Sequence, residues 1–198
     1  MGITSMLYII VTVLTVLLSV YVLFKTKSFY ERGQPLPARV SINWLIVDSL
    51  DILVILLSAF YSVWRMPIGG AVLQAASVLL ALSGAVIMPA GMIEFHSARR
   101  VLGMETSHLV TTGIYRWSRN PQFLGWYLVN AGIALAGVSG YALLVALLTT
   151  VFGHYYIVKL EEPYLERVFG EEYLEHKRRV PRYVGLPKRL WSPPSRSS

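Results

Sequence analysis

One polar segment in an otherwise apolar chain carries residue types suited to ligand binding. It covers residues 109–126 and reads Leu-Val-Thr-Thr-Gly-Ile-Tyr-Arg-Trp-Ser-Arg-Asn-Pro-Gln-Phe-Leu-Gly-Trp. Thr112 and Gly113 permit a tight backbone turn, and Pro121 suits the first turn of a helix. The free amides of that turn and the Arg119 guanidinium together make a site for a carboxylate. An interfacial anchor of Arg, Trp and Tyr at the headgroup level is the alternative.

A second candidate is the acidic pair Glu161 and Glu162, where the last apolar stretch ends. A carboxylate in this position can accept both hydroxyls of a ribose, a usual task of an acidic residue in nucleoside binding. Glu162, His108 and His154 are alternative proton acceptors for a reacting group. A solvated acidic pair at a helix end is the non-functional interpretation.

Composition excludes several kinds of chemistry. The 198 residues include no cysteine, so disulfides, thiolate metal sites and cysteine nucleophiles are excluded. The sequence has no Gly-rich phosphate loop, no His-Glu-x-x-His and no metal-ligand cluster, so we expect no metal. Hydrophobic residues make up 55% of the chain and charged residues only 15%, which predicts a lipid-embedded domain. The net charge of +7 resides in loops and tail, which favours contact with membrane lipids over nucleic acid.

The apolar pattern predicts an all-α, polytopic membrane protein. Stretches near the roughly 20 residues that cross a bilayer are found at 3–24, 44–64, 70–93, 123–138 and 141–160. Ser139-Gly140 separates the last two and predicts a helical hairpin, which brings the two candidate segments together. A surface helix with one apolar stripe is expected over 161–177. We assign residues 1–190 to a single membrane domain and 191–198 to a disordered tail.

Basic residues predict the orientation of the chain. Seventeen of its 18 Lys and Arg residues fall in 25–39, 99–119 and 159–196, which five crossings place on one side, and Arg65 alone falls on the other. The positive-inside rule therefore predicts an external N-terminus and a cytoplasmic site. Within the second apolar stretch, Asp48 and Asp51 share one helical face, where they form either a polar contact of the bundle or a functional site.

The two candidate segments resemble those of the membrane isoprenylcysteine carboxyl methyltransferases and their bacterial and archaeal relatives, which extend to phospholipid methyltransferases. The similarity covers residues 107–187. It rests on Gly-x-Tyr-Arg-x-x-Arg-Asn-Pro-x-Phe-x-Gly from Gly113 to Gly125, and on Glu-Glu-x-x-Leu-x-x-x-Phe-Gly-x-x-Tyr from Glu161 to Tyr173. The resemblance implies a helical membrane enzyme that binds S-adenosylmethionine in a cytosolic pocket capped by the C-terminal segment. It favours a bacterial or archaeal cell membrane over the endoplasmic reticulum.

The resemblance also implies residue roles. The implied cofactor contacts, with the turn glycine added, are Ser107, His108, Leu109, Val110, Gly113, Tyr115, Asn120, Pro121, Gln122, Phe123 and Glu161. The candidate catalytic residues are Arg119, Asn120 and Glu162.

Departures from the family pattern bear on the methyl acceptor. Asn120 stands where the prenylcysteine enzymes have His, and Phe123 where many relatives have Tyr. Tyr156 and Ile157 replace arginines that would hold a substrate carboxylate. We therefore expect a lipophilic or membrane-partitioned acceptor that is not a prenylcysteine carboxylate. A membrane reductase that uses NADPH and a non-catalytic membrane scaffold are the alternatives.

Overall fold

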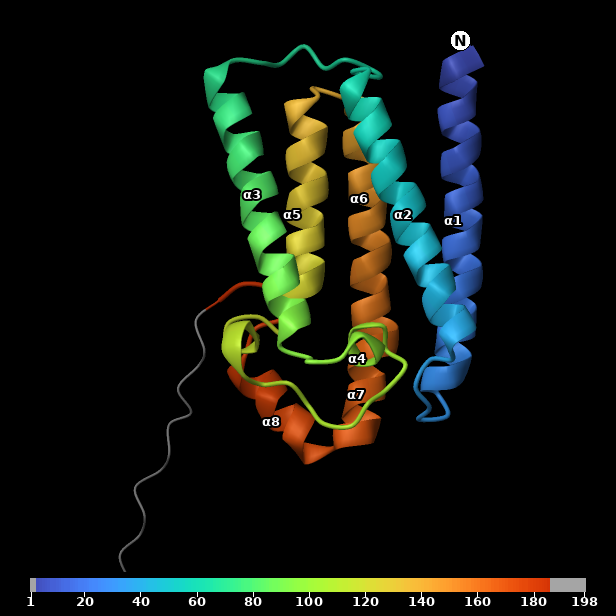
Figure 1. Ribbon diagram of the computed structural model, residues 1–198, viewed down its shortest axis with the longest axis vertical. Helices are drawn as coiled ribbons and strands as arrows, with labels where there is room; N and C mark the ends of the chain where they lie inside the picture. Colours follow the sequence, from blue (N-terminus) through green and yellow to red (C-terminus); the bar gives the residue numbers. More distant parts are fainter. Residues whose placement is uncertain (1–2, 186–198) are drawn as a thin grey trace, which may run out of the picture.

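The computed structural model describes residues 3–185 as a bundle of helices (Figure 1). The long helices are α1 (Ile3–Tyr30), α2 (Ala38–Phe60), α3 (Ala71–Ile93), α5 (Pro121–Ala136) and α6 (Gly140–Tyr156). The short ones, α4 (Ala98–Val101), α7 (Glu162–Phe169) and α8 (Glu171–Arg179), gather at one end of the bundle. A 3-10 turn at Gly113–Arg116 and a π turn at Ile157–Glu161 complete that end. The all-α prediction is confirmed.

Four helices are long and apolar enough to cross a membrane. They are α1, α2, α3 and the continuous helix from Gly140 to Phe169. α5 has 16 residues, or about 24 Å, and is the shorter fifth member of the bundle. Large apolar side chains such as Val72, Leu79 and Val86 are exposed on the outer face of α3, as expected of a surface that contacts lipid. The chain is an integral membrane protein.

Two helices extend beyond their apolar stretches. α1 continues past Phe24 to Tyr30, and α2 begins at Ala38 rather than at Trp44. Pro37 precedes α2 in an extended conformation, where its missing N–H requires no partner. Hydropathy detects only the part of a helix that meets hydrocarbon, so these polar ends lay outside the predicted stretches.

Close packing of α5 on α3 fixes the position of the first turns of α5. A Cβ on Gly125 would lie 2.5 Å from the backbone N of Met88, and one on Gly132 would lie 2.6 Å from that of Ala81. Glycine is therefore required at both positions, as is common where membrane helices approach closely. The polar segment that precedes α5 is thus anchored to the bundle.

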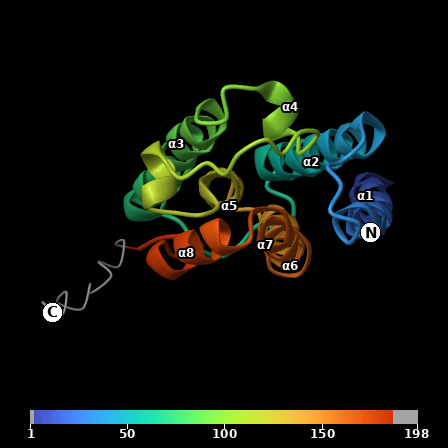
Figure 2. The ribbon, with the colours of Figure 1, turned by 90° about the horizontal axis from the view of Figure 1, so that it is seen from below.

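The helix from Gly140 passes through a π turn before α7. Pro163 has no N–H to donate to the carbonyl of Lys159, and the N–H of Glu162 instead donates to Ile157, five residues back. The prediction of a single surface helix over 161–177 is wrong, because Gly170, at φ +54°, separates α7 from α8. Figure 2 shows α7 and α8 on one side of the end of α5 and the loop from α4 on the other. The predicted tail, 191–198, lies outside the described residues.

Candidate active site

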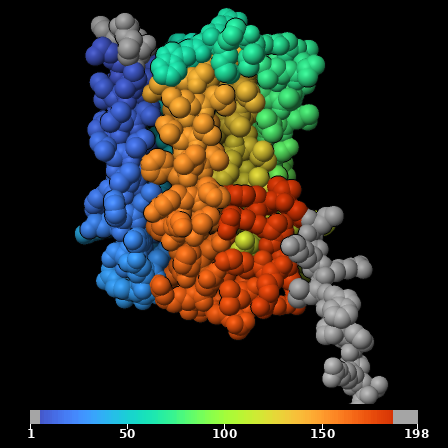
Figure 3. Space-filling model, turned by 180° about the vertical axis from the view of Figure 1, so that it is seen from behind, coloured from blue at the N-terminus to red at the C-terminus, as the bar shows by residue number. Residues whose placement is uncertain are grey.

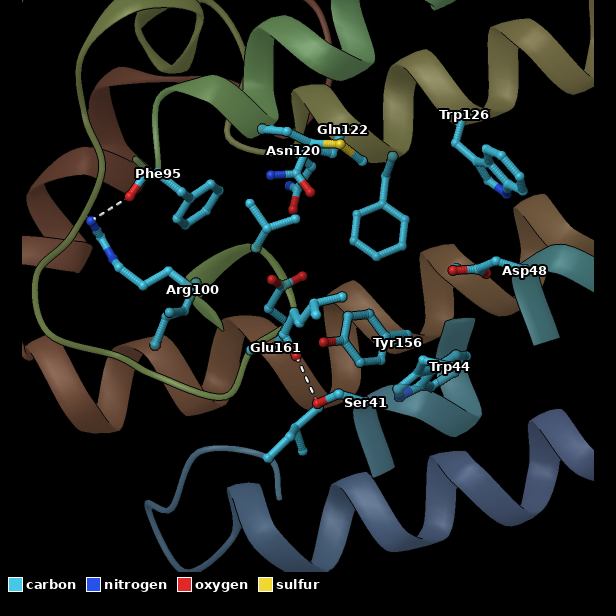
Figure 4. Close-up of a pocket in the computed structure, with 18 of the residues that line it drawn as sticks. Ser41, Trp44, Asp48, Phe95, Arg100, Asn120, Gln122, Trp126, Tyr156 and Glu161 are labelled. Atoms are coloured by element: carbon cyan, nitrogen blue, oxygen red, sulfur yellow. Dashed lines mark hydrogen bonds between the residues drawn. The ribbon is translucent and has the colours of Figure 1, made fainter. Parts of the chain in front are cut away.

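A cavity of about 520 Å³ lies among α2, α3, α5, α6 and the loop after α4. Its polar end includes Arg100, Asn120 and Glu161, and its other end extends along α2 to Asp48 (Figure 4). Asp51, one turn further along α2, also lines the cavity. A volume of this size is typical of small-molecule sites. The cavity contains residues from both segments that the sequence singled out.

Glu161 is the acidic group at the polar end. The π turn directs it into the cavity, next to Tyr156 (Figure 4). Its Oε2 atom is buried and has no hydrogen-bond partner among the described residues. Burying a carboxylate without a partner is unfavourable, so a ligand that donates hydrogen bonds to Glu161 would be strongly preferred there.

The first turn of α5 forms the neighbouring wall. Pro121 occupies the start of the helix, as the sequence predicts, and Asn120 is the residue before it. Gln122 donates from Nε2 to the Tyr115 hydroxyl at 3.1 Å, and burial raises the pKa of Tyr115. Phe123 packs near Tyr156, with 5.6 Å between ring centroids. This wall therefore presents amide groups and aromatic surface to a ligand.

Arg100, from α4, is a buried cation that lines the same end. Its Nη1 donates to the carbonyl of Phe95 at 2.8 Å, and its Nη2 donates to that of His108 at 3.1 Å. These bonds hold the loop that carries His108, Leu109 and Val110 against the cavity. Within residues 3–185 no acidic side chain forms an ion pair with Arg100, so its charge is available to an anionic ligand group.

Glu162 has a different environment from Glu161. It is only 3% exposed, and its Oε1 accepts hydrogen bonds at 2.8 Å from both Arg119 Nη1 and Arg182 Nε. Arg182 Nη2 donates to Oε2 at 3.0 Å, and Lys177 Nζ lies 3.6 Å from the same oxygen. We call Glu162, Arg119, Lys177 and Arg182 the ion-pair cluster.

The ion-pair cluster ties the C-terminal segment to the start of α5. The backbone N–H of Arg119 donates to Pro181, and Asn120 Nδ2 donates to the carbonyl of Arg182 at 3.1 Å. Arg119 Nε also donates to the carbonyl of Val180 at 3.0 Å. Buried His176 contacts the cavity, and burial together with the Arg119 charge lowers its pKa to about 4. Figure 3 shows the C-terminal segment covering this end of the molecule beside α6.

The structure brings most of the candidate residues to one cavity. Those that line it are His108, Leu109, Val110, Tyr115, Arg119, Asn120, Gln122, Phe123 and Glu161. Those that do not are Ser107, Gly113, Pro121 and Glu162. Gly113, at φ +52°, instead lets Glu94 approach the turn and accept a 2.7 Å hydrogen bond from Thr112. The contact functions of all these residues stay predictions.

Sequence analysis did not identify Arg100 as a site residue. It was counted only among the loop charges, because nothing in the sequence distinguishes it from its exposed neighbour Arg99. Tyr30 and Trp44, which also line the cavity, were missed for a similar reason. Aromatic residues at the ends of apolar helices usually signal a membrane interface, and that signal hides a ligand-facing role.

Together, the bundle and the enclosed site define an integral membrane protein with a small-molecule cavity at one end. The family model for phospholipid methyltransferase matches residues 72–172, just over half of the chain, and the chain belongs to that family. Residues of both candidate segments fall within the match.

Individual relatives point the same way. The chain is 32% identical over 119 residues to the protein-S-isoprenylcysteine O-methyltransferase of Rattus norvegicus, covering 58% of this chain and 41% of that one. The Homo sapiens protein of the same name is 40% identical over 91 residues, which are 42% of this chain and 28% of that one. The Saccharomyces cerevisiae protein is 35% identical over 86 residues, 42% of this chain and 34% of that one. The matched region thus spans less than half of the relatives' length, and no solved structure matches the chain.

Proposed function

We propose that the chain is an S-adenosylmethionine-dependent methyltransferase that acts at the cytoplasmic membrane surface on a lipophilic acceptor. The observation that carries the proposal is the Glu161 carboxylate, whose buried Oε2 atom has no hydrogen-bond partner among the described residues, in a cavity that both motif segments line. The family and the relatives' names support methyl transfer.

The residues at the polar end fit this cofactor. The Glu161 carboxylate would accept the ribose hydroxyls, and Arg100, which lacks an acidic partner in the part of the chain described, would hold the methionyl carboxylate. Phe123, Tyr115 and Val110 supply apolar surface for the base. When bound, the cofactor supplies an electrophilic methyl group.

Methyl transfer of this kind depends mainly on alignment and on exclusion of water. Asn120 and Gln122 would orient ligands from the start of α5. Arg119 and Glu162 already bind each other, so we assign them to positioning: they hold α5 and the C-terminal segment around the cavity. Tyr156 and Ile157 cannot form the bidentate contact that an arginine makes with a carboxylate, which makes farnesylcysteine analogues poor acceptors.

Ligand binding to the purified protein in detergent tests the proposed function. S-adenosylhomocysteine, the product form of the cofactor, should raise the melting temperature, because a ligand that binds only the folded state stabilises it. NADPH should not. Stabilisation by NADPH alone would favour the reductase alternative, and no effect of either ligand would favour the scaffold alternative.

The proposed orientation has its own test in this cysteine-free chain. Single cysteines at the exposed positions Arg99 and Glu171 should react with an impermeant maleimide from the cytoplasmic side. A cysteine at exposed Gly69, in the loop between α2 and α3, should react from the other side. Labelling of Arg99→Cys and Glu171→Cys from opposite sides would contradict the topology.

A further inference from the structure

We propose that the end of the cavity lined by Asp48 and Asp51, which we call the deep end, binds a protonated amine. The methyl acceptor is then an amine joined directly to a hydrocarbon chain. This inference rests on the proposed function and names its substrate class. It starts from Asp48, which lines the cavity from the middle of α2, about 15 Å along the helix from Ala38.

Asp48 is a carboxylate that has no partner within the described part of the chain. The side chain is half-buried and lines the cavity from α2 (Figure 4). Across residues 3–185 no hydrogen bond or ion pair engages it, whereas its neighbour Asp51 accepts a 3.2 Å hydrogen bond from Thr149. An ionisable group at this depth is costly unless something binds it. The cavity leaves space for that partner.

The surroundings of Asp48 favour a cation over a neutral donor. Trp126, from α5, lines the same end of the cavity, and Trp44, one helical turn earlier on α2, lines the wall between Asp48 and Tyr156 (Figure 4). Indole faces attract ammonium groups, more strongly where water is excluded. In the described chain the arginines that line the cavity are Arg100 and Arg119, and both are bonded at the polar end. Among the described residues, the deep end therefore has two carboxylates, the Trp126 indole with Trp44 nearby, and no cation.

The same charges argue against a phospholipid headgroup. A headgroup amine is accompanied by a phosphate, which would lie close to Asp48 and Asp51, where residues 3–185 place no cation to hold it. Like charges at such short range repel strongly in a low-dielectric site. A single-chain amine avoids this repulsion, and its hydrocarbon chain matches lining residues such as Met88 and Ile52.

Asp48 also has a place in the reaction. An ammonium must lose one proton before its nitrogen can accept a methyl group. The Asp48 carboxylate would take that proton, giving a neutral amine and a neutral carboxylic acid. Charge is conserved within the pair, and no further reactant is needed for this step.

Dodecylamine and dodecan-1-ol, titrated calorimetrically into the purified protein in the same detergent, test the subsite. We expect the amine to bind more tightly than the alcohol, and Asp48→Asn to weaken amine binding at least tenfold without changing alcohol binding. Asp48→Glu should retain part of the amine affinity. Asn43→Ala, on the same helix but outside the residues that line the cavity, is the matched control and should change neither.

S-adenosylhomocysteine affinity, measured on the same samples, separates this inference from the proposed function. It should be the same in the wild type and in Asp48→Asn, which also shows that the variant is folded. Equal binding of amine and alcohol, or no effect of Asp48→Asn, overturns the amine subsite while S-adenosylhomocysteine binding leaves the proposed function standing. Failure of the wild type to bind S-adenosylhomocysteine contradicts the proposed function itself.

Methyl transfer from labelled donor distinguishes the two sources of an amine. Dodecylamine should be methylated, and phosphatidylethanolamine in vesicles should not. Methylation of phosphatidylethanolamine without dodecylamine would overturn the single-chain assignment.

Discussion

Two adjacent glutamates, at the junction of the π turn and α7, occupy opposite environments. Glu161 faces the cavity with one oxygen unpartnered, whereas Glu162 points away from it and binds Arg119 and Arg182. Glu162 is buried and Glu161 is half-buried with its Oε2 atom enclosed, so burial alone does not identify a functional acid. The difference lies in the hydrogen-bond partners. A carboxylate whose oxygens are all bonded to protein groups holds the fold together, and one without such partners is available to a ligand.

The largest effect on stability should come from Glu162, whose carboxylate is fully hydrogen-bonded to protein groups. Glu162→Gln leaves the buried Arg119 guanidinium without its counter-ion, and breaking such a pair costs about 3 kcal/mol or more. We expect a marked fall in melting temperature in detergent. Glu171→Gln, at an exposed position on α8, should leave the melting temperature nearly unchanged. Equal stability of Glu162→Gln and the wild type would remove the structural role of the ion-pair cluster.

Glu161→Gln should show the reverse pattern. The substitution removes the charge of a carboxylate whose buried Oε2 atom has no partner among the described residues, so the melting temperature should hold or rise. Loss of a charged acceptor typically costs about 1.5–3 kcal/mol, and S-adenosylhomocysteine should therefore bind roughly tenfold more weakly or worse. Calorimetry checks the affinity. An unchanged dissociation constant would exclude Glu161 from the cofactor site.

Arg100 extends the contrast to a cation, because within the described residues it has no acidic partner, as Glu161 has no basic one. Arg100→Gln should weaken S-adenosylhomocysteine binding about tenfold, as a charged hydrogen bond is lost. It should have little effect on methylthioadenosine, which lacks the methionyl carboxylate. Arg99→Gln, at the exposed neighbouring position, is the control. Equal losses for both ligands would mean that Arg100 only holds the loop in place.

The smallest effect concerns His176, next to the ion-pair cluster. Its pKa falls from 6.5 to about 4 on folding, so the unfolded chain binds a proton that the folded chain does not. Stability from this group is present above pH 6.5 and is lost as the pH falls toward 4. The melting temperature should drop less between pH 7 and pH 5 in His176→Gln than in the wild type. A variant at exposed His96, His96→Asn, should follow the wild type, and identical slopes for all three would contradict this assignment.

Local signals in the sequence predicted much of the scaffold. Apolar length and Ser139-Gly140 predicted the helical bundle and the α5–α6 hairpin, and Pro121 predicted the start of α5, because each acts within one or two turns of chain. Gly170 was not predicted to break the helix, because the apolar residues on both sides of it keep a helical spacing. Only its positive φ reveals the bend.

The environment of individual side chains was harder to predict. Glu161 and Glu162 are identical in type, and their directions depend on the π turn next to Pro163. The environments of Arg99 and Arg100 differ only because of the path that the loop after α3 takes over the bundle. In the ion-pair cluster, Arg119 binds Glu162, 43 positions later, and Val180, 61 positions later. Such contacts depend on tertiary structure and leave no local pattern.

An experimental structure of the complex with S-adenosylhomocysteine is the most direct test of the contrast between the two glutamates. We predict ribose hydroxyls within hydrogen-bond distance of Glu161, with Glu162 still bound to Arg119 and Arg182. A nucleoside bound away from Glu161, or held by Glu162 instead, would contradict the account.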